Sequence, residues 1–288
     1  MDTLSRRSGP ESVASYLHLF GGPYVTVGAE HREIAEGSKR LLALLALRRG
    51  RVERCCAAGL LWPGVGERRA SGNLRSALWR LRAADLDLVA ADQVSLMLRA
   101  EVGVDVDEVS AWARRLIQGS AAAADLVLDP CIDAALDLLP GWYDDWALFE
   151  RERLRHRVLH ALESLSRQLC ARDRCADGVE AALLAVAADP IRESAQRALI
   201  EAHLSEGNIG EARHTYTTFH RLILRELGVP PSAQLAGLLA RPPVPAGADR
   251  APAHRDTRPV PGSPDDAGPN EVRRASAPPP PAPPGRPR

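Results

Sequence analysis

Two short stretches near the N-terminus alternate between apolar and polar residues, a period of two that is typical of half-buried β-strands. They cover residues 16–20 and 24–27, and the Gly21-Gly22-Pro23 segment between them is typical of a tight turn. The pattern predicts two antiparallel strands, and a third strand is expected near residues 31–35.

A helical period follows. Ser38 is a residue type that caps helix N-termini, and the apolar segment KRLLALLALRR after it predicts a buried helix that stops at Gly50. A second, weaker helix is predicted over residues 53–62, and Pro63 closes it.

The third predicted helix, about residues 69–84, is the most informative. Leu74, Leu78 and Leu81 fall at i, i+4 and i+7, so they form one buried stripe. The side chains that must then project outward are Arg75, Ser76, Trp79, Arg80 and Arg82.

Residues 88–91 and 94–98 flank Asp92-Gln93 and predict a hairpin. Strands, three helices and a hairpin, in this order, are the elements of a winged helix, with the second and third helices as the helix-turn-helix. An arginine-rich third helix with an apolar rear stripe suits the major groove of DNA. An ordinary solvated amphipathic helix is the alternative, but it explains an outward-facing Trp79 poorly.

The second half of the chain has a helical pattern throughout, from Val104 to Leu239. Successive helices are predicted over residues 105–118, 130–139, 146–170, 177–188, 194–205 and 209–227. The last helices pair as antiparallel hairpins whose spacing brackets the 34-residue tetratricopeptide period. We therefore expect an all-α, tetratricopeptide-like repeat domain that offers binding surfaces and needs no catalysis.

Charge divides the chain in the same place. The totals balance at 37 basic and 37 acidic residues, but residues 37–84 hold 11 basic and 2 acidic, whereas residues 101–150 hold 2 basic and 11 acidic. The basic block suits a polyanion such as nucleic acid. Two solvated faces that attract one another would also explain the pattern.

Composition adds the domain boundaries. Fifteen of the last 48 residues are proline, which predicts a disordered tail over residues 241–288. We expect a disordered N-terminus at 1–15, a winged helix at 16–103 and the helical domain at 104–240.

Several classes of protein are excluded by what the sequence lacks. No apolar run approaches the roughly 20 residues of a membrane helix, and no secretory signal is present. The five cysteines have no metal-binding spacing, and motifs for nucleotide binding, serine hydrolysis or zinc proteolysis are missing. We expect a cytoplasmic protein that is not an enzyme and has no metal or cofactor.

Five stretches resemble the SARP family, the actinobacterial antibiotic regulatory proteins, which are transcription activators. They are LRSALWRLR, the preceding LLWPGVGERRASGN, LPGWYDDWALFERERLRHRVLHALESL, AADPIRESAQRALIEAHLSEGNIGEA and RELGVPPSAQL. The resemblance spans about residues 16–240. One departure is the wing turn Ala91-Asp92-Gln93, which lacks the usual glycine.

The resemblance implies an OmpR-type winged helix followed by a bacterial transcriptional activation domain. It implies activation of a secondary-metabolite cluster through binding to promoter direct repeats and recruitment of RNA polymerase holoenzyme, without catalysis. The loop at residues 62–69 would contact polymerase. Its candidate residues are Trp62, Glu67, Arg68 and Arg69.

We therefore expect a sequence-specific activator that binds double-stranded DNA as a dimer. Four side chains are expected to face the groove: Arg75, Ser76, Trp79 and Arg80. Lys39 and Arg82 are candidates for phosphate contacts that set the register. The alternative from another class is a helical-repeat interaction adaptor whose DNA-binding domain is degenerate.

Overall fold

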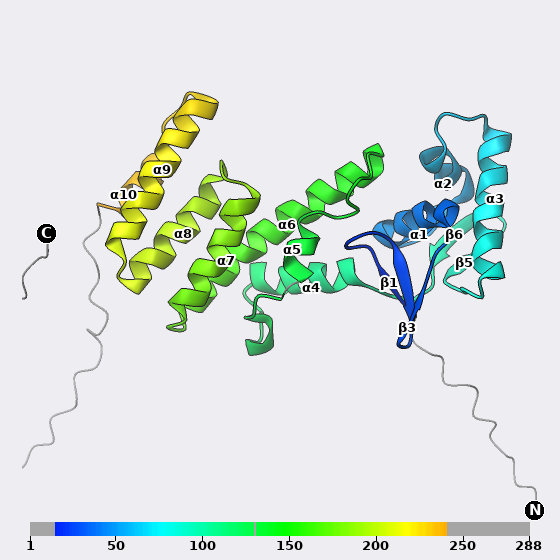
Figure 1. Cartoon of the computed structure of the whole chain (residues 1–288), viewed down its shortest axis with the longest axis horizontal. Coiled ribbons are helices and arrows are strands. Elements are labelled where there is room, and N and C mark those ends of the chain that lie inside the picture. Colours follow the sequence, from blue (N-terminus) through cyan, green and yellow to red (C-terminus); the bar gives the residue numbers. More distant parts are fainter. Residues whose placement is uncertain (1–14, 130, 241–288) are drawn as a thin grey trace, which may run out of the picture. The chain divides into compact units, whose positions relative to one another are not determined.

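The structure is a computed structural model that describes residues 15–129 and 131–240. The expected disordered N-terminus, except for Ser15, and the whole proline-rich tail lie outside the described residues. Strands and helices mix up to Val104, and helices follow from Asp105 onward (Figure 1). The predicted fold class, a winged helix followed by an all-α region, is confirmed.

The strands of the described chain form two small sheets. The first has the order β3-β2-β1-β7 and consists of β1 (Ser15–His18), β2 (Tyr24–Val27), β3 (Glu30–Arg32) and β7 (Gly103–Val104). The second has the order β4-β6-β5 and consists of β4 (Val52–Glu53), β5 (Val89–Ala91) and β6 (Ser95–Leu98). Sequence reasoning missed β4 and β7, because two residues are too few to show a period.

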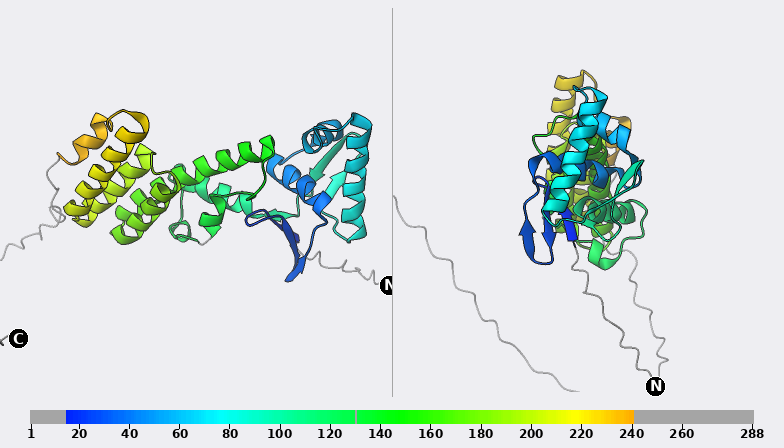
Figure 2. Two further views of the ribbon diagram at one scale, coloured as in Figure 1. Left: turned by 45° about the horizontal axis from the view of Figure 1, so that its top comes forward. Right: turned by 90° about the vertical axis from the view of Figure 1, so that its right-hand side faces the viewer.

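Three helices complete the winged helix: α1 (Glu36–Arg48), α2 (Arg54–Leu61) and α3 (Glu67–Ala83). The prediction that Ser38 caps α1 is wrong, because Ala35 holds that position and Ser38 lies inside the first turn. The buried Ser38 hydroxyl instead donates a hydrogen bond of 2.9 Å to the carbonyl of Ala77. It ties α1 to α3, which packs on both α1 and α2 (Figure 2).

Within the described residues after Val104, seven α-helices follow: α4 (Asp105–Ile117), α5 (Cys131–Ala135), α6 (Asp145–Cys170), α7 (Cys175–Ala188), α8 (Glu193–Glu206), α9 (Ile209–Leu227) and α10 (Ala233–Leu238). From α6 to α9 each helix packs on the next, which confirms the predicted hairpins. Small residues permit the crossings, and a Cβ atom on Gly178 of α7 would lie 2.7 Å from Cys170 Sγ of α6. The helix predicted over 130–139 ends early, at Ala135, and Leu138 instead forms an isolated antiparallel bridge with Phe20.

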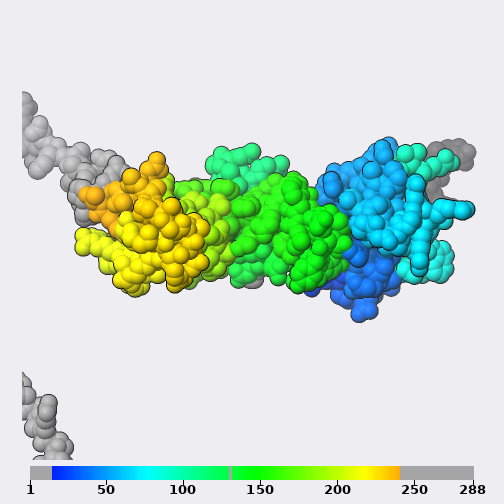
Figure 3. Space-filling model, turned by 90° about the horizontal axis from the view of Figure 1, so that it is seen from above, coloured from blue at the N-terminus to red at the C-terminus, as the bar shows by residue number. Residues whose placement is uncertain are grey.

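One hydrophobic core joins the winged helix to the helical region, so the colours of the two meet in Figure 3. The amides of Leu19 and Phe20 donate hydrogen bonds to the Asp105 carboxylate over 2.7 and 2.9 Å. Arg40 of α1 pairs with Asp144, which precedes α6. The winged helix is therefore packed against α4 and the start of α6, and it is not a separate domain on a linker.

Candidate nucleic-acid interface

Helix α3 carries the most cationic surface of the winged helix. Gly66 holds its N-cap position; Glu67 in the first turn and the arginines in the last turn suit the helix dipole, whereas Arg68 and Arg69 in the first turn oppose it. Leu74, Leu78 and Leu81 are buried as predicted. The other face holds five arginines, and none of them has an ion-pair partner among the residues described: Arg68, Arg69, Arg75, Arg80 and Arg82.

The outward face of α3 has a shallow surface depression next to an exposed aromatic ring. Trp79 is 69% exposed, so it does not pack into the core. The depression is lined by Arg69, Gly72, Asn73, Arg75, Ser76 and Trp79. The structure thus brings Arg75, Ser76 and Trp79 together as predicted, and the Ser76 hydroxyl bonds to its own helix at the Gly72 carbonyl.

Two residues of this face were missed or assigned elsewhere. The predicted groove-facing set does not include Asn73, and it leaves Arg69 to the polymerase loop. Arg69, Asn73 and Ser76 are separated by four and three positions, so they share one face of α3. That spacing is visible in the sequence and could have identified both residues.

The side chains of Arg80 and Lys39 each lie against a neighbouring group of the protein. The Arg80 guanidinium lies against the first turn of α1, where a Cβ atom on Gly37 would be only 2.5 Å from Nη1. Lys39 Nζ lies 2.8 Å from a carboxylate oxygen of Glu36. Arg82 is exposed in the last turn of α3. Arg80 and Arg82 are both exposed, whereas Lys39 is half-buried.

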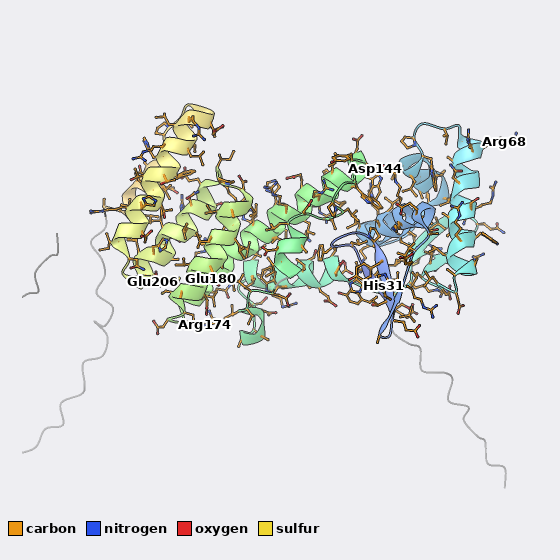
Figure 4. All side chains as sticks on the ribbon, viewed as in Figure 1. His31, Arg68, Asp144, Arg174, Glu180 and Glu206 are labelled. Atoms are coloured by element: carbon orange, nitrogen blue, oxygen red, sulfur yellow. The ribbon has the colours of Figure 1, made fainter. Side chains whose placement is uncertain are left out.

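The segment assigned to polymerase contact is only partly a loop. Trp62 follows α2, but α3 begins at Glu67, so Glu67, Arg68 and Arg69 form the first helical turn. The prediction that all four are loop residues is therefore wrong. The helix begins before Arg69 because the Gly66 carbonyl accepts hydrogen bonds from the amides of Arg69 and Ala70. Figure 4 shows Arg68 at the loop end of α3, pointing away from the protein.

The wing turn is built by an aspartate in place of the missing glycine. Asp92 Oδ1 accepts the amides of Val94 and Ser95 over 2.8 and 2.6 Å. These bonds, led by the one from Ser95, hold the pKa of Asp92 well below its usual range. Arg51 pairs with the same carboxylate, and Arg54 donates to the Asp92 carbonyl over 3.1 Å. Two more cations therefore lie at the base of the wing.

One cluster within residues 15–129 and 131–240 could hold a metal ion. The donor atoms of Glu53, Cys55 and Cys56 lie within 4.8 Å of one another. Both thiols donate toward Glu53 Oε2, and this hydrogen bond raises the pKa of Cys55. All three side chains are exposed. No helix in the described part of the chain is both long and apolar enough to cross a membrane.

Comparisons with known proteins agree with this architecture. Residues 112–241, 130 of the 288, match the model of a family described as "Bacterial transcriptional activator domain". Among solved structures, the chain is similar to Mycobacterium tuberculosis EmbR in complex with a low-affinity phosphopeptide, with a TM-score of 0.63 and 18% identity. No curated protein sequence matches the chain.

The similarity to EmbR covers 79% of this chain and 64% of that one, so the chain spans less than two thirds of that structure. The matched share of 79% of this chain is more than the chain holds from residue 112 onward, where the family match begins. The shared fold therefore includes the N-terminal region with strands as well as the helices.

Proposed function

We propose that the chain, whose residues 112–241 match the model of a family described as "Bacterial transcriptional activator domain", is a sequence-specific, DNA-binding activator and not an enzyme. The winged helix, residues 16–103, binds promoter DNA, and the helical domain, residues 104–240, contacts the transcription machinery. The activated genes belong to a secondary-metabolite cluster, as the resemblance to SARP activators implies. The protein acts in the cytoplasm.

A single observation carries the DNA-binding part of this proposal. Helix α3 presents five arginines without ion-pair partners in the described chain, together with an exposed Trp79, on the face opposite its buried leucines. Most of the other arginines that the structure describes pair with an acid or a carbonyl. Unpaired cations on a convex helix are suited to the phosphates and the guanine edges of a major groove.

We assign the roles from position on the helix. Arg75, Ser76 and Trp79 read the groove with Arg80, whose guanidinium must leave Gly37 to do so. Arg82 and Lys39 contact phosphates, and Lys39 must first release Glu36. Phosphate contacts position the protein, and base contacts provide specificity.

The test compares affinities for a promoter fragment and for random DNA by electrophoretic mobility shift at fixed salt. Arg75→Ala is expected to cost about 1–3 kcal/mol on the promoter and to reduce the preference for it. Arg82→Ala should weaken both DNAs alike. Arg213→Ala, an exposed arginine of α9, is the control and should change neither affinity. Unchanged promoter affinity in Arg75→Ala, Trp79→Ala and Arg82→Ala would rule out α3 as the reading helix.

Polymerase contact is proposed for the surface formed by Trp62, Glu67, Arg68 and Arg69. Glu67→Ala and Arg68→Ala should leave DNA affinity unchanged and lower transcription with purified polymerase holoenzyme. Arg69 shares a depression with Ser76, so Arg69→Ala is expected to lower DNA affinity as well. Equal losses of binding and transcription in Glu67→Ala and Arg68→Ala would mean that this surface contacts DNA.

We further propose that two copies bind a direct repeat. One winged helix buries only about 600–1,000 Å² on DNA, which is little for selective binding. Copies on the same face must be about 10–10.5 base pairs apart, or a multiple of this. Lengthening the repeat by five base pairs should abolish paired footprints, and ten should partly restore them. Equal protection at every spacing would show independent monomers.

A further inference from the structure

A second polar site lies where the C-terminal end of α1 meets α4 and α6. It consists of two adjoining cavities of about 200 and about 550 Å³. Asp107, Ser110 and Arg157 line both, so the two form one continuous groove. The groove is on the order of a small-ligand pocket in volume. It lies between the winged helix and the helical region and is separate from α3.

The groove is strongly cationic although the surrounding sequence is acidic. Five arginines line it: Arg48, Arg49, Arg114, Arg153 and Arg157. The acids among its lining residues are Asp107, which pairs with Arg49, and Glu150, which lies 3.1 Å from Arg153. Five cations against two acids leave a net charge of +3.

Three of these arginines have no acid to neutralise them. Within residues 15–129 and 131–240, Arg48, Arg114 and Arg157 form no ion pair. Arg157 is partly buried, and Arg48 and Arg114 are exposed. Guanidinium groups that converge on one hollow repel each other, and a multivalent anion between them would relieve the repulsion.

Apolar side chains complete the groove. Leu47, Val106, Leu138, Leu154 and Ile117 line its walls between the arginines. A site with apolar walls and a few polar groups is the general form of a small-molecule pocket. Inorganic anions alone would leave those walls uncovered.

We propose that this groove binds a small organic anion with two or more phosphate or carboxylate groups, held by Arg48, Arg114 and Arg157. The ligand would compete with Asp107 for Arg49, whose ion pair links α1 to α4. Binding would therefore act on one of the contacts that join the winged helix to the helical region. This inference does not rest on the proposed function, because binding is measured on the protein alone.

The test is isothermal titration calorimetry of the full chain with inorganic triphosphate and, separately, with citrate, at matched ionic strength. One molecule of at least one probe should bind per chain. Arg114→Ala and Arg157→Ala should each weaken binding about tenfold or more, because each removes a charge-assisted contact. Asp107→Asn should strengthen binding, since it removes a competing acid. Arg213→Ala on α9 should bind as the wild type does.

Hydrogen exchange on the wild-type chain locates the site even if a variant fails to fold. Bound probe should protect amides at the start of α4 and in the middle of α6. Protection elsewhere, equal affinity in the two arginine variants, or no binding of either probe would overturn the proposal. So would displacement of the probe by duplex DNA in Arg75→Ala as well as in the wild type, because the groove would then be a nucleic-acid site.

Discussion

Arg192→Met should be among the most damaging single substitutions in the helical region. Glu163, on α6, has a side chain that is only 4% exposed, and Arg192 Nε donates to its Oε1 over 2.6 Å. The Ser194 hydroxyl donates to the same oxygen over 2.7 Å, and His160 Nδ1 lies 3.5 Å from the other. This carboxylate is thus also the partner of His160. It fixes the start of α8 against α6.

The magnitude follows from what the substitution leaves behind. Without Arg192 a buried carboxylate keeps only the hydroxyl and the imidazole, and breaking a buried pair typically costs about 3–5 kcal/mol. Because two partners remain, we expect about 3 kcal/mol of lost unfolding free energy. The double variant Glu163→Met, Arg192→Met should lose far less than the sum of the single changes, since it removes both charges together.

Urea denaturation followed by circular dichroism measures these free energies. Arg197→Met is the matched control on the same helix, because its pair with Glu193 is wider, at 3.6 Å, and about one third exposed. We expect less than about 1 kcal/mol for it. A loss below about 1 kcal/mol in Arg192→Met, or additive losses in the double variant, would refute the reasoning about the buried charge.

Three further outcomes are expected. Leu74→Ala on the buried face of α3 should cost about 2–5 kcal/mol of unfolding free energy, whereas Trp79→Ala on the exposed face should change it by no more than about 0.5 kcal/mol. Equal losses in urea denaturation would contradict the orientation of α3. Asp92→Ala should speed hydrogen exchange at the two wing amides that donate hydrogen bonds to the Asp92 carboxylate. Unchanged exchange by NMR would mean that the strands alone hold the turn. Burial raises the pKa of Asp105 above its unfolded value of about 3.9, so its stabilising contribution is complete below that pH and is lost as the pH rises through the folded-state pKa. In denaturation experiments from pH 3 upward, the unfolding free energy of the wild type should fall relative to that of Asp105→Asn. A constant difference in unfolding free energy between the two would exclude this effect.

The hydrophobic period alone predicted much of this protein. It identified β1, β2, the three helices of the winged helix, the wing hairpin and the helical hairpins from α6 to α9. It also predicted which face of α3 is buried, because Leu74, Leu78 and Leu81 occupy one stripe whatever packs against them. The outward set that includes Arg75 and Trp79 follows from the same geometry. The excess of basic residues could likewise be read from residue counts, but the absence of ion-pair partners on that face could not.

Only the tertiary structure decided which polar groups meet across distant elements. Serine is a residue type that suits a helix cap, but the Ser38 hydroxyl instead donates a hydrogen bond to a buried carbonyl of α3, 39 positions away in the sequence. Glu163 meets Arg192 and Arg40 meets Asp144 for the same reason: partners far apart in sequence leave no local period. The length of a helix is also decided by tertiary contacts: α5 ends at Ala135, and Leu138 pairs with the distant Phe20 instead of continuing the helix. Periodicity indicates which face of a helix or strand is buried, and only the folded chain determines which residues pack against that face.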